Sequence, residues 1–265
     1  MHSGVPPYFT SLRPFLEYFG MGTPWLMYHK LGPRPPRVRL KGLYLSSRLF
    51  ERQLSELRAA GFRTPSYGSR INDAGNHERQ IRLTFDDGSA SVFRHGMAPL
   101  AAHGFRGIQF LVAGRLGSPN DWEIREGEAA EPLMDDIQVR EWLAAGHEIG
   151  SHTLTHPFLT RVSLQQANYE ITASKKQLED QFGVPIRHFC YPYGDWNTAV
   201  RDLVSAAGYA SACTTGFGIN TAQTHPFELK RILARYQSIS FKAIKERLTR
   251  FCRRSQPGTS QPIHS

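Results

Sequence analysis

The sequence predicts an α/β fold in which about seven parallel strands form a distorted barrel surrounded by helices. Short apolar runs alternate with segments of helical periodicity along almost the whole chain of 265 residues. No shift in composition and no repeat divides this pattern, and the length suits one domain of barrel size. About seven strands fit a barrel better than an open sheet, although the ring need not be complete.

The predicted strands are short apolar runs bounded by polar or turn residues. In chain order they cover residues 24–28, 81–85, 107–112, 148–151, 188–191, 210–214 and 230–236. The predicted helices begin near Ser47, Ser89, Ile137, Ser163, Asn197 and Ser240. The first five are each followed by a glycine, which is typical of a left-handed helix cap. The longest irregular segment, residues 114–132, is acidic and is predicted to be a lid or rim loop.

The composition indicates a basic globular domain. The formal net charge is +9, with basic residues gathered at 34–41 and 242–254. These clusters form either a solvated surface or a surface that attracts an anionic glycan or membrane, whereas no motif supports nucleic-acid binding. The three cysteines are too widely spaced for a disulfide framework or a zinc knuckle, and Cys190 and Cys213 are expected to be buried in strands.

The expected domain organisation is simple. Residues 1–23 form an N-terminal extension, residues 24–252 a single domain, and residues 253–265 a flexible tail rich in Ser, Pro and Gln. No signal peptide or transmembrane stretch is recognisable, which makes a cytoplasmic location the default expectation, although a wrongly assigned start codon could hide a signal. The oligomeric state is left open.

Two carboxylates follow the second predicted strand. In parallel barrels the active site is built at the carboxyl ends of the strands, and Asp86 and Asp87 lie at such an end. Adjacent side chains at a strand end point in different directions, so one carboxylate can bind a metal while the other stays unligated nearby. The alternative is an Asx turn or a cap for the helix that begins at Ser89.

Two imidazoles follow the fourth predicted strand. The spacing of four places His152 and His156 on one side of a helical turn, as metal binding requires. No Glu follows the first His, unlike in HExxH proteases, so the proton-accepting carboxylate must come from elsewhere, and Asp86 fits. One Asp and two His leave positions open for water and substrate, and they suit zinc, cobalt or nickel. The alternative is a pair of hydrogen-bonding loop histidines.

The strings Thr84-Phe85-Asp86-Asp87-Gly88 and Ser151-His152-Thr153-Leu154-Thr155-His156-Pro157 resemble the two signature motifs of the polysaccharide deacetylases. This family is also known as the NodB homology family or carbohydrate esterase family 4. The resemblance implies a NodB-like barrel, with Asp86 as general base and Asp87, His152 and His156 as metal ligands.

A third string, Phe189-Cys190-Tyr191-Pro192-Tyr193-Gly194, resembles a family motif that usually reads RxPYG. The resemblance implies that the backbone N–H of Tyr193 helps to bind the oxyanion and that Pro192 and Tyr193 line the substrate groove. Cys190 stands where the family has an arginine that orients the base, and Arg231 on the last strand is the predicted replacement. Alternatively, the string is an ordinary proline turn.

Aromatic residues near this string could stack on a sugar ring or could simply pack. Trp196 ranks above Trp122 as a substrate contact because it follows the third string closely.

The first strand ends in Tyr28-His29, which resembles the start of a subgroup that deacetylates poly-N-acetylglucosamine. The resemblance implies that His29 is the acid that protonates the leaving amine; a hydrogen-bonding strand-end histidine is the alternative. His225 is the rival acid, in a loop that looks less fixed. The family's usual late motifs are not clearly present.

Three functions remain open from the sequence. The favoured one is a metal-dependent de-N-acetylase of an N-acetylated glycan or lipid-linked sugar. The others are an O-acetyl polysaccharide esterase and a non-catalytic glycan-binding protein that retains the metal site.

Overall fold

The computed structural model describes residues 11–36, 38–65, 79–124 and 127–234. The predicted helix beginning at Ser240, the basic cluster at 242–254 and Cys252 lie outside these residues.

Seven parallel strands form a closed barrel, as the alternation of elements predicts. The strands are β1 (Trp25–Tyr28), β6 (Arg82–Phe85), β7 (Gly107–Leu111), β8 (Glu148–Ser151), β9 (His188–Cys190), β10 (Ser211–Phe217) and β11 (Leu229–Leu233). They follow one another around the ring in chain order, and β1 closes it by pairing with both β6 and β11. The ring is therefore complete, and the carboxyl ends of all seven strands meet at one end of the barrel.

Two parallel pairs of very short strands lie outside the barrel. β2 (Lys30–Leu31) pairs with β3 (Tyr44–Leu45), and β4 (Phe62–Arg63) pairs with β5 (Arg79–Gln80). Segments of two residues are too short to show any periodicity, so these pairs could not be predicted from the sequence pattern.

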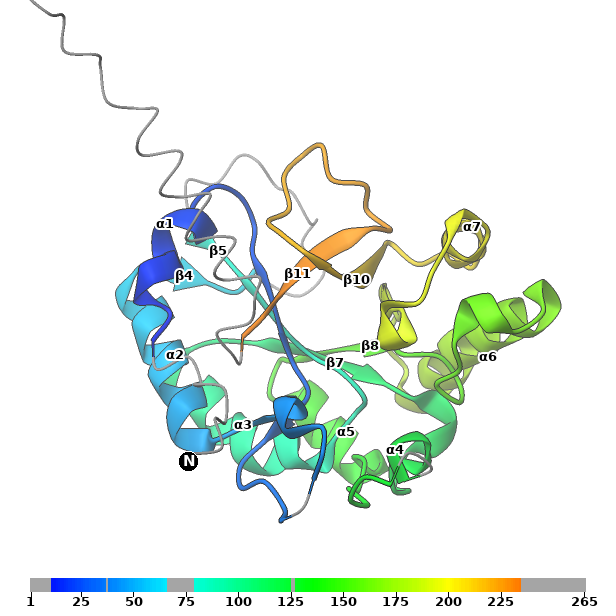
Figure 1. Ribbon diagram of the computed structural model, residues 1–265, viewed down its shortest axis with the longest axis horizontal. Helices are drawn as coiled ribbons and strands as arrows, with labels where there is room; N and C mark the ends of the chain where they lie inside the picture. The colour runs from blue at the N-terminus through cyan, green and yellow to red at the C-terminus, as the bar shows by residue number, and fades with distance from the viewer. Residues whose placement is uncertain (1–10, 37, 66–78, 125–126, 235–265) are drawn as a thin grey trace, which may run out of the picture.

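Helices surround the barrel strands (Figure 1). They are α1 (Leu16–Phe19), α2 (Ser47–Ala59), α3 (Ala90–His103), α4 (Asp121–Ile124), α5 (Asp136–Ala144), α6 (Leu164–Phe182) and α7 (Thr198–Ala206). The expected caps are present: the side chains of Ser163 and Asn197 accept backbone hydrogen bonds at the starts of α6 and α7. Gly104 and Gly183 end α3 and α6 in the left-handed conformation.

The longer helices bury one apolar stripe each against the barrel. In α2 this stripe contains Phe50, Leu54 and Leu57, all of them fully buried. Full burial of such a side chain stabilises the fold by about 1.5–3 kcal/mol. Among the described residues, no helix is both long enough and apolar enough to span a bilayer.

In the segment 114–132, called the rim segment below, the described residues are more ordered than the sequence predicts. It contains the short helix α4 and folds back on itself through an antiparallel bridge between Pro119 and Pro132. A second bridge joins Leu133, just beyond it, to Ser89, which lies two residues after Asp87. The rim segment is therefore fixed next to the carboxyl end of β6.

Candidate metal centre and catalytic site

The barrel brings most of the candidate side chains together at one end. Asp86 and Asp87 follow β6, His152 follows β8, and His29 lies between β1 and β2. Arg231 reaches the same place from within β11. Asp86, Asp87, His152 and Arg231 are almost completely buried.

Asp87, His152 and His156 face one another through their ligand atoms. Oδ1 of Asp87 lies 3.5 Å from Nε2 of His152 and 3.4 Å from Nε2 of His156, and the two nitrogens are 3.2 Å apart. Ligands in a tetrahedral zinc site lie about 3.4 Å from one another, because the bonds are about 2.1 Å long. The three atoms therefore fit one face of a tetrahedral site, which leaves a fourth position for water or substrate.

The two histidines are oriented in different ways. Nδ1 of His152 lies 2.8 Å from the carbonyl oxygen of Cys190, which directs the lone pair of Nε2 toward Asp87 when Nδ1 carries the proton. Nδ1 of His156 is buried, and no hydrogen-bond partner for it exists among the described residues. The ring of His156 instead packs against aromatic side chains.

The prediction that a helical turn joins the two histidines is wrong. Residues 152–156 leave β8 as an irregular turn, with Thr153 and His156 in the left-handed region at φ 71° and 64°. The carboxylate of Glu170 on α6 accepts hydrogen bonds from the backbone N–H groups of Leu154 and Thr155, both at 2.9 Å. These hydrogen bonds satisfy backbone N–H groups of the turn without a helix. The two imidazoles therefore meet because of this irregular turn and not because they lie on one face of a helix.

Backbone strain is concentrated at this site. The described residues contain four non-glycine residues with positive φ, and all four belong to the motifs singled out above: Asp87, Thr153, His156 and Tyr193. The left-handed conformation costs a non-glycine residue roughly 1–2 kcal/mol. Such strain persists where the surrounding structure enforces it, and it is enriched at functional sites.

Arg231 binds Asp86 through the two terminal nitrogens of its guanidinium group. Nη1 donates to Oδ1 at 2.7 Å and Nη2 donates to Oδ2 at 2.8 Å. Burial raises the pKa of Asp86, but the charge and hydrogen bonds of Arg231 outweigh this effect and bring that pKa below its usual value. Asp86 is therefore an ionised, unligated carboxylate beside the Asp-His-His group.

The two candidate acids lie in different places. Nε2 of His29 is 3.9 Å from Oδ2 of Asp86, and its side chain is 17% exposed. His225 is exposed in the loop before β11, and the next residue, Pro226, accepts a hydrogen bond from Ala212 near the amino end of β10. His29 therefore lies beside Asp86, whereas His225 lies toward the opposite end of the barrel.

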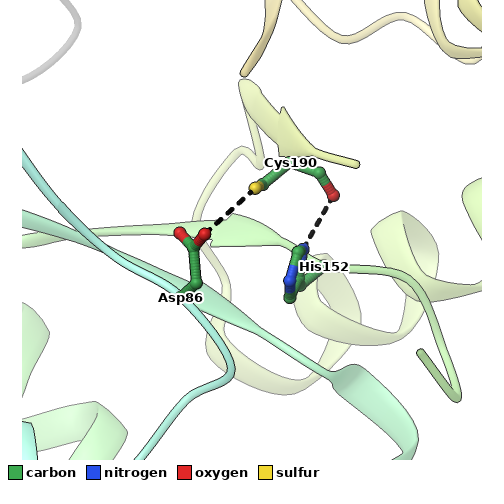
Figure 2. A group of neighbouring side chains, drawn as sticks. All are labelled: Asp86, His152 and Cys190. Carbon is green, nitrogen blue, oxygen red and sulfur yellow. Dashed lines mark hydrogen bonds between the residues drawn. The ribbon is translucent and has the colours of Figure 1, made fainter. Parts of the chain in front are cut away.

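A second group of candidate ligands adjoins the first. Figure 2 shows Asp86, His152 and Cys190 converging, with Sγ of Cys190 at 3.6 Å from Oδ2 of Asp86. However, Nη2 of Arg231 lies 3.1 Å from the same sulfur, so a cation already occupies this side of Asp86. Burial also raises the pKa of Cys190 to about 11, which disfavours the thiolate that a metal needs. This group therefore does not fit a metal ion.

The third string forms an aromatic wall beside His156. The ring of Tyr193 is 40% exposed, stacks on Phe158 at 3.8 Å and meets His156 edge-on at 4.5 Å. Pro192 is buried, and Trp196 stacks on Tyr191 at 5.9 Å. Tyr193 therefore borders the candidate metal site.

Comparison with known proteins decides the family. The family model for polysaccharide deacetylase matches residues 73–212, which is more than half of the chain and includes both signature strings. The chain belongs to the polysaccharide deacetylase family. The resemblance inferred from the motifs is thereby confirmed, as is the barrel.

Individual relatives of this polysaccharide deacetylase are distant. YxkH of Bacillus subtilis (strain 168), itself named only by family, is 24% identical over 213 residues, covering 79% of this chain and 70% of the relative. Peptidoglycan-N-acetylglucosamine deacetylase PgdA of Listeria monocytogenes serotype 1/2a (strain 10403S) is 26% identical over 173 residues, covering 65% of this chain and 32% of the relative. The match thus spans only about a third of PgdA. The structure of IcaB from Ammonifex degensii shares the fold, with a TM-score of 0.71 at 23% identity, covering 85% of this chain and 96% of that one.

Sequence reasoning missed several residues around the site of this deacetylase. Glu170 lies in the middle of α6, where its periodicity gives no sign that it caps the histidine turn. Lys30 and Glu123 are buried and form an ion pair although 93 residues separate them in the sequence. Only tertiary structure brings such residues together, so no local signal could have identified them.

Proposed function

We propose that this polysaccharide deacetylase is a metal-dependent hydrolase that removes N-acetyl groups from an N-acetylated glycan. One observation carries the proposal: three ligand atoms 3.2–3.5 Å apart lie next to a separate carboxylate that Arg231 holds in its ionised form. The names of the relatives support the acetylated-sugar substrate, and that of PgdA supports an N-acetyl group in particular.

The donor set is that of a catalytic metal site. Asp87, His152 and His156 would hold a divalent ion, most simply zinc, with cobalt and nickel as alternatives. When bound, such an ion polarises a carbonyl and acidifies a coordinated water.

The other residues would handle protons and the substrate. Asp86 would take the proton from the attacking water, since its carboxylate is ionised and not needed as a ligand. His29 would protonate the departing amine. Its 3.9 Å separation from Asp86 exceeds a hydrogen bond, so a proton would pass between them through substrate or water. The backbone N–H of Tyr193 would stabilise the oxyanion, which is worth roughly 3 kcal/mol for one donor.

The proposal also includes three predictions from the sequence that concern the substrate, the partner and the location. They are a lipid-linked sugar as an alternative substrate, a contact with an anionic membrane or glycan, and a cytoplasmic location. The basic residues at 34–41 support an anionic partner through their charge.

The test is acetate release from N-acetylglucosamine oligomers by protein reloaded with zinc or cobalt. We expect chelation to abolish release, and Asp86→Asn to lower the rate about 10²–10⁴-fold while one equivalent of metal still binds. Asp202→Asn, an exposed aspartate on α7, is the matched control and should be unaffected.

Two outcomes would contradict the proposal. If acetate is released only from O-acetyl esters, the protein is an esterase. If the protein binds metal and oligomers but releases no acetate from either substrate, it is a glycan-binding protein.

A further inference from the structure

The orientation of His156 is not fixed by a hydrogen bond at its second ring nitrogen. A metal-binding histidine almost always donates its other N–H to a partner, as His152 can to the carbonyl oxygen of Cys190. Nδ1 of His156 has no such partner within the described part of the chain, although the side chain is buried. Among the described residues, ring packing is therefore the contact available to hold the imidazole with Nε2 toward Asp87.

Among the described residues, Trp122 is the aromatic side chain that stacks face to face on His156. The two rings stack with their centroids 4.5 Å apart and their planes 21° from parallel, while Tyr193 touches the same imidazole only edge-on. Trp122 is 7% exposed, so its indole is a packed side chain and not an open platform for a sugar. The indole can therefore orient the imidazole, provided that Trp122 itself is fixed.

The helix that carries Trp122 is too short to fix it. α4 has four residues, fewer than a stable isolated helix needs. The next residue, Glu123, is buried and pairs with the ammonium of Lys30, which is also buried. Asn120 adds a hydrogen bond from Nδ2 to Oε2 of Glu123 at 2.8 Å. Adjacent residues of a helix point about 100° apart, so α4 is held by Glu123 on one side while Trp122 covers His156 on another.

Lys30 connects this helix to the carboxyl end of β1. It directly follows His29, and the strand pair that contains it is tied to the rim segment again by a 3.0 Å hydrogen bond from the hydroxyl of Tyr44 to Glu131. Burial and the nearby carboxylate of Asp87 raise the pKa of Glu123 to about 7, although Lys30 opposes this effect. Without Lys30, the buried Glu123 would be costly as an anion.

We propose that Trp122, held in place by the Lys30–Glu123 ion pair, orients the imidazole of His156 for metal binding. Lys30, Glu123 and Trp122 are thus positioning residues, since none of them supplies a ligand atom to the Asp-His-His group. This inference rests on the proposed metal site and deepens it. It also assigns the rim segment a function: it supports a metal ligand in addition to bordering the barrel mouth.

The test is equilibrium titration of chelator-treated protein with Co²⁺ at pH 8. Trp122→Leu and Lys30→Met should each weaken Co²⁺ binding about 10–100-fold, the usual effect of losing an outer partner of a metal ligand. The variant that combines Trp122→Leu with Lys30→Met should bind Co²⁺ no more weakly than Trp122→Leu alone, because both changes act through one contact. Lys30→Arg, which keeps the charge, should restore most of the affinity.

Two controls separate positioning from folding. Lys176→Met removes an equivalent charge from an exposed pair with Asp180 on α6 and should leave the affinity unchanged. Lys30→Met combined with Glu123→Met replaces the ion pair by apolar side chains, which often leaves stability unchanged. We expect this variant to be folded by circular dichroism and still weak in Co²⁺ binding.

The outcomes distinguish this inference from the proposed function. If the wild-type protein binds no Co²⁺, the Asp-His-His group is not a metal site and the proposed function fails. If the wild type binds Co²⁺ and the Lys30→Met/Glu123→Met variant binds it equally well, packing of Trp122 against Val112 and Leu133 suffices and the ion pair does not position it. If Trp122→Leu also binds normally, the indole does not orient His156.

Discussion

Arg231 determines the charge state of Asp86. The carboxylate is buried, and burial alone would raise its pKa, but two hydrogen bonds and the adjacent positive charge lower that pKa below its usual value. A general base must be deprotonated, so this arrangement should preserve activity on the acid side of the pH profile.

Replacing Arg231 by Met removes the opposing charge and leaves burial as the dominant effect. The pKa of Asp86 should rise, and the acid limb of kcat/KM should move to higher pH, with a lower rate at neutral pH. The measurement is a pH–rate profile for acetate release. Arg201→Met removes an arginine that pairs with Glu228 at the protein surface and should leave the acid limb in place. An unshifted limb in Arg231→Met would show that Asp86 is not the titrating base.

The residues of the site illustrate what a sequence can and cannot reveal. The two aspartates and the two histidines each lie within one short string of the sequence, so both pairs could be identified from spacing and chemistry alone. The positive φ of Asp87, Thr153, His156 and Tyr193 could not be predicted, because none is glycine. Arg231 could be proposed only as a guess, since its contact with Asp86 spans 145 residues.

At the scale of the element, β8 has a proposed metal ligand at one end and a residue that affects stability at the other. Its carboxyl end leads into His152, whereas His147 directly precedes it at the amino end. Nδ1 of His147 accepts a hydrogen bond from the backbone N–H of Gly107 at 3.2 Å, and its ring packs 4.1 Å from that of Trp142. Both interactions suit a neutral imidazole.

Burial, with a smaller effect from Arg106, lowers the pKa of His147 from 6.5 to about 4. The unfolded chain therefore binds a proton at higher pH than the folded protein does. The neutral His147 therefore contributes to the free energy of unfolding fully above about pH 6.5. This contribution is lost as the pH drops toward 4, by about 3 kcal/mol in all.

Urea unfolding at pH 7.5 and pH 5 tests this prediction. The wild type should lose more unfolding free energy between these two pH values than His147→Gln, whose side-chain oxygen can still accept from Gly107. The other titrating groups are common to both proteins and cancel in the comparison. Identical losses in the two proteins would mean that His147 titrates normally.

The elements also separate what periodicity predicts from what it misses. The seven barrel strands and the five long helices within the described residues have enough residues to show an apolar pattern, and they were predicted within a few residues of their bounds. β2, β3 and α4 have two to four residues each and depend on contacts with distant segments. β2 and α4 bring Lys30 and Glu123 together, although neither element is long enough to be predicted from periodicity.

At the scale of the whole molecule, the barrel separates the end that carries the proposed active site from a buried charged cluster at the other end. Arg82, Glu148 and His188 are the first residues of β6, β8 and β9, and all three are buried. Glu148 lies 3.4 Å from Nη1 of Arg82 and 3.6 Å from Nε2 of His188. In parallel barrels the amino end contributes stability, whereas the carboxyl end carries the chemistry.

Glu148→Ala should therefore destabilise the protein without damaging the metal centre. It leaves the guanidinium of Arg82 buried without its carboxylate, which typically costs 3–5 kcal/mol, or roughly 10²–10³-fold or more in the folding equilibrium. Thermal unfolding should show the loss, while acetate release and metal stoichiometry, measured well below the unfolding midpoint, should match the wild type. Glu148→Met combined with Arg82→Met should recover much of the stability, because apolar side chains can replace a buried ion pair. A fall in activity equal to that of Asp86→Asn, in protein that is still folded, would show that the two ends of the barrel are coupled and that the cluster at the amino end also serves catalysis.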